Sequence, residues 1–353
     1  MRTGKPTLAP RLQDSKNDRF SFSLFEKTKV SLASWRLGGG LGVFFIVLIL
    51  FSFCTPLFAD SDKPKNYFPP LLLCEKKHNL LVHVTSHGKR DWDWALDGPL
   101  LDVQAQPSGY FLVTGGTKKV SLVRKAWKGC RTIWDWSELG DIAPESAVAV
   151  DWDGNGNPSL VAAADTPHSR LIMSEGKSKG IKIRWEYKLP SPPMKVQICP
   201  DSNNLLVVLK DSTVEEVQYQ EDKVVWSMGK ADGFKDVCDA ARGPWGHTYV
   251  AERAEGDILC FDPHKNKVWQ THLPFAPSHS FEVASLSVFK KQGKRMVMAF
   301  AHYTGSGSSA QDIVYLLNAE TGKVVAWNSK TDKGGYPACL KAVPDLGGSL
   351  RKQ

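Results

Sequence analysis

The chain has 353 residues, with 45 lysines and arginines against 37 aspartates and glutamates, and a formal net charge of +8. Residues 1–36 hold eight Lys/Arg against three Asp/Glu, so residues 60–353 carry only +3 and show no basic cluster interleaved with aromatics. This distribution gives no support for nucleic-acid binding. The length does not require two domains, because closed all-β folds often exceed 200 residues as one unit.

The first predicted element is a membrane segment. Residues 37–59 contain no charge and are long enough to span a bilayer, and residues 1–36 form a basic leader expected to stay cytoplasmic. Two interpretations remain open: an uncleaved transmembrane anchor, or a signal-peptide core cleaved near Ala59 after the run Leu57-Phe58-Ala59. Both place the rest of the chain on the periplasmic or extracellular side. Residues 60–65 then form a linker.

Tryptophans mark a repeat in the remaining chain. Their spacings are 42, 49, 41, 43 and 58 residues, and each ends a short β-rich run; the six are Trp94, Trp136, Trp185, Trp226, Trp269 and Trp327. Three further β-rich runs lie between neighbours, for example residues 194–199, 205–209 and 213–219. Four strands per unit are typical of a propeller blade. The sequence therefore predicts an all-β propeller of six blades over residues 66–346, with a tail at 347–353 and the tryptophans packed between blades on the outermost strands.

The two ends of this region are predicted to share one blade. A single strand around 338–343 would join three strands around 70–74, 79–84 and 90–96 and so close the ring, removing its open edges. Such a pairing brings Cys74 and Cys339 onto neighbouring antiparallel strands. In an oxidising compartment they are candidates for a disulfide, against the alternative of two unrelated thiols.

The segment from Asp312 to Trp327 carries a resemblance. Its strand, Asn turn, Thr-Gly-Lys and Val-Val-Ala-Trp resemble the PQQ-like repeat of quinoprotein-type propellers, and Asp257 to Trp269 repeats this more loosely. Six blades with terminal Trp are more remotely similar to the arylsulfotransferase propellers. PQQ-dependent dehydrogenases typically have eight blades and two adjacent cysteines, and this sequence has no Cys-Cys pair. The resemblance therefore implies an exported non-catalytic scaffold, with no PQQ and no other assigned cofactor.

A candidate calcium loop begins at Asp151. Asp151, Asp153 and Asn155 place oxygen atoms at the first, third and fifth positions, and a glycine follows at the sixth, as in loops that wrap calcium. The loop resembles the FG-GAP type of other propellers, but Ser159 stands where those carry Asp. An ordinary Asn-Gly hairpin turn explains the same residues.

Polar residues are also expected on one loop face. Loops joining the second and third strands of a blade open on the same side as loops between blades, and this face receives His168, Arg170, Glu252, Arg253, His279, His302 and Tyr303. Three histidines with an arginine could bind an anion or act as general acid and base. The alternative is a set of separate surface residues.

The function expected from these features is binding without catalysis. The chain is predicted to be an exported or membrane-anchored module for a protein or a cell-envelope ligand, tethered through residues 37–59. Two alternatives stay open: transfer of a sulfuryl group or other small anion by His168, His279 and His302, and calcium-assisted ligand binding at the Asp151 loop.

Overall fold

The computed structural model describes residues 69–342, apart from 76–78, 87–89, 107–108, 127–128, 275–280, 305–309 and 332–336. The predicted leader, membrane segment, linker and tail lie outside this part of the chain. Within the described ranges no helix is long and apolar enough to cross a membrane.

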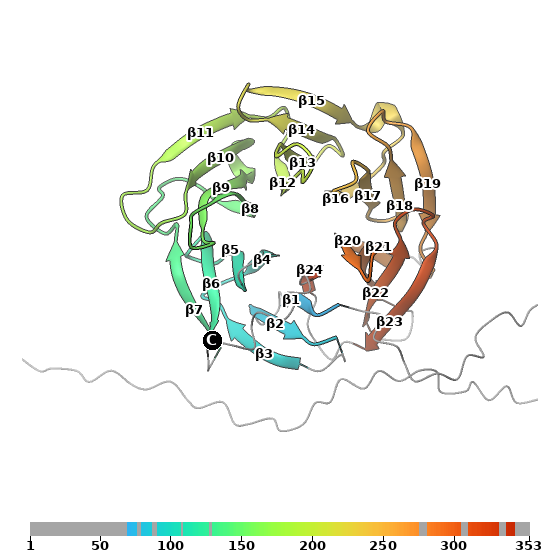
Figure 1. The fold of residues 1–353 in the computed structure, drawn as a ribbon, viewed down its shortest axis with the longest axis horizontal. Helices are drawn as coiled ribbons and strands as arrows, with labels where there is room; N and C mark the ends of the chain where they lie inside the picture. The colour runs from blue at the N-terminus through green and yellow to red at the C-terminus, as the bar shows by residue number, and fades with distance from the viewer. Residues whose placement is uncertain are drawn as a thin grey trace, which may run out of the picture.

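Six four-stranded antiparallel sheets form a closed ring, as predicted (Figure 1). Blade 1 combines β24 (Pro337–Ala342) with β1 (Leu71–Glu75), β2 (Leu80–Val84) and β3 (Arg90–Ala95). Blade 2 consists of β4 (Leu100–Ala105), β5 (Tyr110–Gly115), β6 (Val120–Ala126) and β7 (Gly129–Asp135). Blade 3 consists of β8 (Pro144–Trp152), β9 (Pro158–Asp165), β10 (Arg170–Glu175) and β11 (Ile183–Lys188). Blade 4 consists of β12 (Pro193–Ile198), β13 (Leu205–Leu209), β14 (Val214–Gln218) and β15 (Lys223–Met228). Blade 5 consists of β16 (Val237–Arg242), β17 (Thr248–Glu252), β18 (Asp257–Phe261) and β19 (Lys267–His272). Blade 6 consists of β20 (Phe281–Lys291), β21 (Lys294–Thr304), β22 (Ala310–Asn318) and β23 (Val324–Thr331). Two 3-10 turns, η1 (Thr166–His168) and η2 (Lys230–Asp232), accompany the strands.

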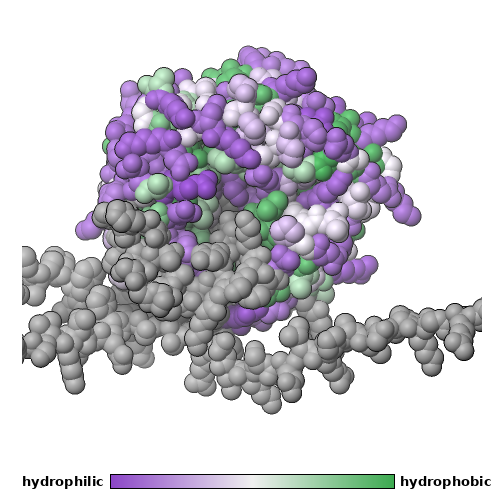
Figure 2. Space-filling view, turned by 180° about the vertical axis from the view of Figure 1, so that it is seen from behind, coloured by the Kyte–Doolittle hydropathy of each residue, from purple (hydrophilic) through white to green (hydrophobic). Residues whose placement is uncertain are grey.

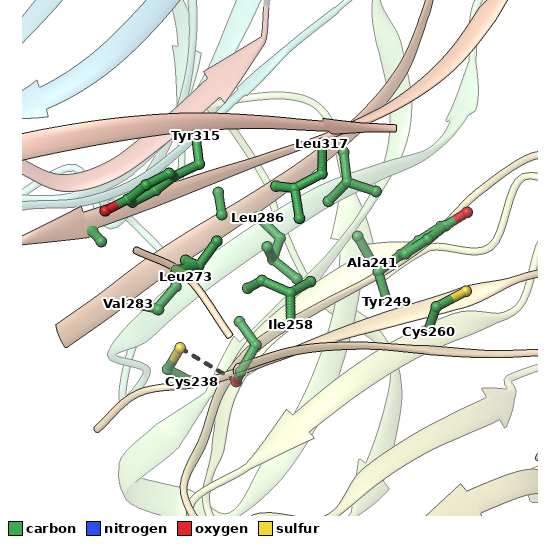
Figure 3. Close-up of a cluster of buried hydrophobic side chains, with 14 of the residues drawn as sticks. Cys238, Ala241, Tyr249, Ile258, Cys260, Leu273, Val283, Leu286, Tyr315 and Leu317 are labelled. Carbon is green, nitrogen blue, oxygen red and sulfur yellow. Dashed lines mark hydrogen bonds between the residues drawn. The ribbon is translucent and has the colours of Figure 1, made fainter. Parts of the chain in front are cut away.

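Burial follows the position of a strand in its blade. Residues of the middle strands β13, β17 and β18 are buried throughout, because a neighbouring blade covers each face. Residues of the outer strands β3, β11 and β19 alternate between exposed and half-buried. The core therefore lies between blades, as Figure 3 shows for blades 5 and 6, where Tyr249 and Ile258 share one cluster with Leu286 and Tyr315. Burial of this apolar surface holds the blades together.

The first and last strands share blade 1, as predicted. β24 pairs antiparallel with β1, and this register places Cys74 opposite Cys339. Cys74 is buried and disulfide-bonded, whereas Cys130, Cys199, Cys238 and Cys260 are free. The side chain of Cys339 lies outside the described residues, so the Cys74–Cys339 bridge stays a prediction.

The tryptophan repeat needs a correction of register. In every blade a β-bulge interrupts the pairing of the third and outermost strands, and the outer-strand residues that resume the pairing are Trp92, Trp134, Trp185, Trp226, Trp269 and Ala326. Trp94 and Trp136 therefore lie two residues past the repeat position. Trp327 lies one residue past the repeat position. The prediction that Trp327 packs in the core is wrong, because this residue is 40% exposed. A shift of one residue turns a strand side chain to the opposite face.

Candidate ligand-binding face

The loop face carries a network around Asp165 in blade 3. Asp165 is fully buried at the end of β9, and η1 with the left-handed Ser169 turns the chain back toward β10. The Asp165 carboxylate accepts hydrogen bonds from the Ala143 N–H (2.9 Å) and Arg170 Nε (2.7 Å), and lies 2.8 Å from His168 Nδ1. One carboxylate thus fixes the predicted His168 and Arg170 and also the preceding inter-blade loop.

The remaining nitrogens of this pair also contact the protein. His168 Nε2 lies 3.2 Å from Asp141 Oδ2, and the Arg170 guanidinium donates to Glu186 at 3.0 Å and to the Asp141 carbonyl at 3.1 Å. Burial alone would lower the pKa of Arg170, but the Asp165 and Glu186 carboxylates raise it. The positive charge of Arg170 is therefore matched inside the network, which stabilises the loop.

The other predicted histidines do not join this network. His302 on β21 contacts Asp312 of β22, with 2.9 Å between Nδ1 and Oδ1. It belongs to blade 6, on the opposite side of the ring from blade 3 (Figure 1). His279 and the side chain of Tyr303 lie outside the described residues. The structure therefore does not bring His168 and His302 together.

A cavity of about 310 Å³ lies between blades 4 and 5, and we call it the blade 4–5 groove. Its lining is Met228, Asp232, Gly233, Lys235, Glu252, Asp257, Leu259, Phe261, Lys265, Lys267 and Gln270. Acidic residues gather at its loop-face end, where β18 begins, and Lys265 and Lys267 lie at the other end, where β19 begins. Lys235 also lies at the loop-face end, beside Glu252. The groove therefore combines an apolar wall with a mixed-charge, mainly acidic end and a basic end.

Glu252 is the one predicted site residue that lines this groove. It is 3% exposed, and its Oε1 accepts a hydrogen bond of 2.8 Å from the Lys235 N–H. Burial raises the pKa of the Glu252 carboxyl, and the nearby Asp257 carboxylate raises it further. Its neighbour Arg253 instead pairs with Asp236 on the loop face, at 3.6 Å.

The Asp151 loop joins the first two strands of blade 3, on the face opposite the loop face. The Asp153 carboxylate accepts the N–H groups of Asn155 (2.9 Å) and Asn157 (2.8 Å), and these bonds lower its pKa. Asp262 makes the same bonds to His264 and Asn266, in a turn without calcium-loop spacing. The geometry is therefore that of a side-chain-capped turn. Within the described ranges, no group of three or more His, Cys, Asp or Glu residues is placed to hold a metal.

A polar belt on the innermost strands was not predicted. Each inner strand pairs with its neighbour through a bulge, and the residues that follow it are Asp102, Ser146, Lys195, Asp239, Ser285 and Cys339. Ser146 Oγ donates to Asp102 Oδ2 at 2.6 Å and accepts the Val196 N–H at 3.2 Å, which links blades 2, 3 and 4. In β4, β8, β12, β16 and β20 the residue after the bulge is polar, but further polar residues in the same strands, such as Gln104 and Gln197, obscure this signal in the sequence.

The belt continues through a buried ion pair and Asp239. Lys195 Nζ lies 3.4 Å from Asp102 Oδ1. Burial would lower the pKa of Lys195, but the carboxylates of Asp102 and Asp239 raise it. Asp239 in turn accepts the Leu286 N–H at 2.8 Å, which links blades 5 and 6. The belt therefore ties neighbouring blades together at their inner strands.

The surface around these sites is mainly hydrophilic. Figure 2 shows apolar residues scattered among polar ones on the face opposite that of Figure 1. Isolated apolar residues of this kind are normal on soluble surfaces.

Comparison with known proteins supports the fold. No protein-family profile and no curated protein matches the sequence. A solved protein of unknown function from Bacteroides caccae is 17% identical, with a TM-score of 0.58, over 78% of this chain and 99% of that one. The structure of BBS1N in complex with ARL6DN is 10% identical, with a TM-score of 0.51, over 76% of this chain and 78% of that one. At these identities the likeness shows a shared fold alone, and the chain is a six-bladed β-propeller.

Proposed function

We propose that the chain is a non-catalytic binding module that receives a segment of a partner protein in the blade 4–5 groove. The observation that carries the proposal is the groove itself, in which buried Leu259 and Phe261 lie beside charged residues. Binding sites commonly combine an apolar wall with a few placed polar groups. A propeller of similar fold, BBS1N, was solved in complex with a protein, ARL6DN, which agrees with such a role.

The positions of the histidines support binding over group transfer. An anion-transfer site built from His168 and His302 would need both imidazoles within reach of one substrate, but they belong to opposite blades. Each also contacts its own aspartate, Asp165 or Asp312. Nothing in their geometry favours the transferase alternative over binding.

Site-specific photo-cross-linking in the native cell tests the groove. A photoreactive residue replaces Lys267, which is exposed and lines the groove. The control replaces Lys323, which is exposed directly before the outer strand of blade 6. We expect a discrete protein adduct from position 267 only. Equal labelling from both positions, or no adduct from position 267, would contradict the proposal.

Export is proposed from residues 37–59, together with the resemblance of the blades to PQQ-like repeats of exported scaffolds. The propeller then lies on the extracytoplasmic side, anchored or released after cleavage near Ala59. A reporter that is active only in the cytoplasm, fused after Gln353, should stay inactive in intact cells. Full reporter activity would refute export and leave the groove proposal untouched.

A further inference from the structure

An aromatic cluster lies on the outer wall where blade 3 meets blade 4. Trp185 and Tyr187 of β11 stack with 5.9 Å between ring centroids, and Tyr219, directly after β14, meets Trp185 edge-on at 6.2 Å. All three rings are half-buried, so each keeps surface open to solvent. We call these rings, with the carboxylates of Glu215 and Asp222, the Trp185 cluster.

Two carboxylates act on this cluster. Asp222 accepts a hydrogen bond of 2.6 Å from the Trp185 indole N–H, which fixes the ring. Glu215 belongs to β14 and is 8% exposed, and its buried Oε2 has no hydrogen-bond partner among the described residues. Side chains alternate along β14, so Glu215 lies on the same face as Val217 and Tyr219, which pack in one cluster with Trp185 and Tyr187. Burial raises the pKa of Tyr187, and the charges of Glu215 and Asp222 raise it further.

A buried carboxylate without a partner is costly, and proteins normally pair it with a donor or a cation. The cost is tolerated where the missing partner is a ligand. Aromatic faces beside such a carboxylate attract cations through the ring quadrupole. Glu215 and the exposed parts of the Trp185 and Tyr187 rings therefore favour the same kind of ligand.

The equivalent tryptophans differ in whether a cation of the protein covers them. Trp92 occupies the repeat position of blade 1, and Lys125 Nζ lies 6.0 Å from its ring centroid. Trp226 occupies that of blade 4, with the Arg242 guanidinium at 5.5 Å and Lys265 Nζ at 5.9 Å. Among the residues that the structure places, no lysine or arginine lies over Trp134, Trp185 or Trp269. At Trp185 the neighbouring charges are negative instead.

We propose that the Trp185 cluster binds the ammonium or guanidinium group of a basic side chain on a partner protein. The aromatic rings face the cation, and Glu215 supplies the opposite charge beneath them. The site is separate from the blade 4–5 groove, so it stands or falls independently of the function proposed there.

The test uses the full-length chain in a non-ionic detergent, with labelled tryptophan indoles followed by NMR. The probes are Nα-acetyl-lysinamide, its neutral Nε-acetylated form, and choline. We expect a saturable shift of the Trp185 indole N–H with the cationic lysine probe and about tenfold weaker binding of the neutral form. Tighter binding of choline than of the lysine probe would assign the site to a small quaternary ammonium and overturn the protein partner.

Variants localise the effect. Glu215→Gln and Trp185→Leu should each weaken binding of the lysine probe about tenfold. Trp92→Leu is the matched control, because Lys125 already covers that ring, and it should bind the probe as the native chain does. Glu215→Gln keeps the test valid if Trp185→Leu does not fold. No shift with the probe, or equal affinity in the native and Glu215→Gln chains, would overturn the proposal.

Discussion

A disulfide between Cys74 and Cys339 would clasp the ring where its two ends meet. The perturbation that tests it is the double variant Cys74→Ser/Cys339→Ser, which removes the bridge without leaving an unpaired thiol. The bridge would close a loop of about 265 residues between strands whose register places the two residues opposite each other. For that loop the chain-entropy relation assigns a loss of about 5 to 6 kcal/mol, an upper value because residual structure in the unfolded chain reduces it.

Denaturant unfolding followed by tryptophan fluorescence measures this loss. The double variant should unfold at a much lower denaturant concentration than the native chain. Cys130→Ser, which replaces a free thiol, should change the midpoint little. Non-reducing peptide mapping of protein purified without reductant gives the direct check. Recovery of Cys74 in a disulfide with any residue other than Cys339, or of both as free thiols, would refute the clasp.

Three further predictions follow from the described contacts. Ser146→Ala should lower the free energy of unfolding by about 1 to 3 kcal/mol, because it leaves the buried Asp102 Oδ2 without its donor, and an unchanged denaturation midpoint would contradict the polar belt. Glu215→Gln should raise the melting temperature at neutral pH. Burial raises the pKa of Glu215, so the ionised carboxylate destabilises the folded chain above that pKa. The gain in melting temperature should therefore disappear as the pH falls below the ordinary glutamate range. A gain that does not change with pH would show that the charge of Glu215 is not its cause. Calcium or a chelator should leave the melting temperature unchanged, because the Asp153 carboxylate is occupied by N–H groups of its own turn; a calcium-dependent rise would restore the calcium interpretation.

The blade count and the closure of the ring were predictable from local patterns. Tryptophan spacings of 41 to 58 residues, with three apolar runs between neighbours, permit few folds other than a propeller. The closing blade followed from counting strands at the two ends, and β24 pairs with β1 as that count required. These features depend on how many strands the chain holds and in what order, and sequence patterns report both.

The exact tryptophan register was not predictable in this way. When the blades are aligned on the outer-strand bulge, Trp92 and Trp134 hold the repeat positions that the tryptophan spacing had assigned to Trp94 and Trp136. In blade 6 the same bulge places Ala326 at the repeat position and exposes Trp327. A bulge has no reliable sequence signature, and its effect is to exchange the two faces of a strand.

The closure of the blades into a ring determines which candidate site residues lie close together. The sequence placed His168 and His302 on one loop face, but the order of the blades puts them on opposite sides of it. Glu252 became part of a cavity only because blade 4 supplies the other wall, and Glu215 acquires aromatic neighbours only where blade 3 packs against blade 4. Local sequence determines strands and their order, whereas contacts between blades join residues far apart in the chain, and only tertiary packing sets which side chains meet there.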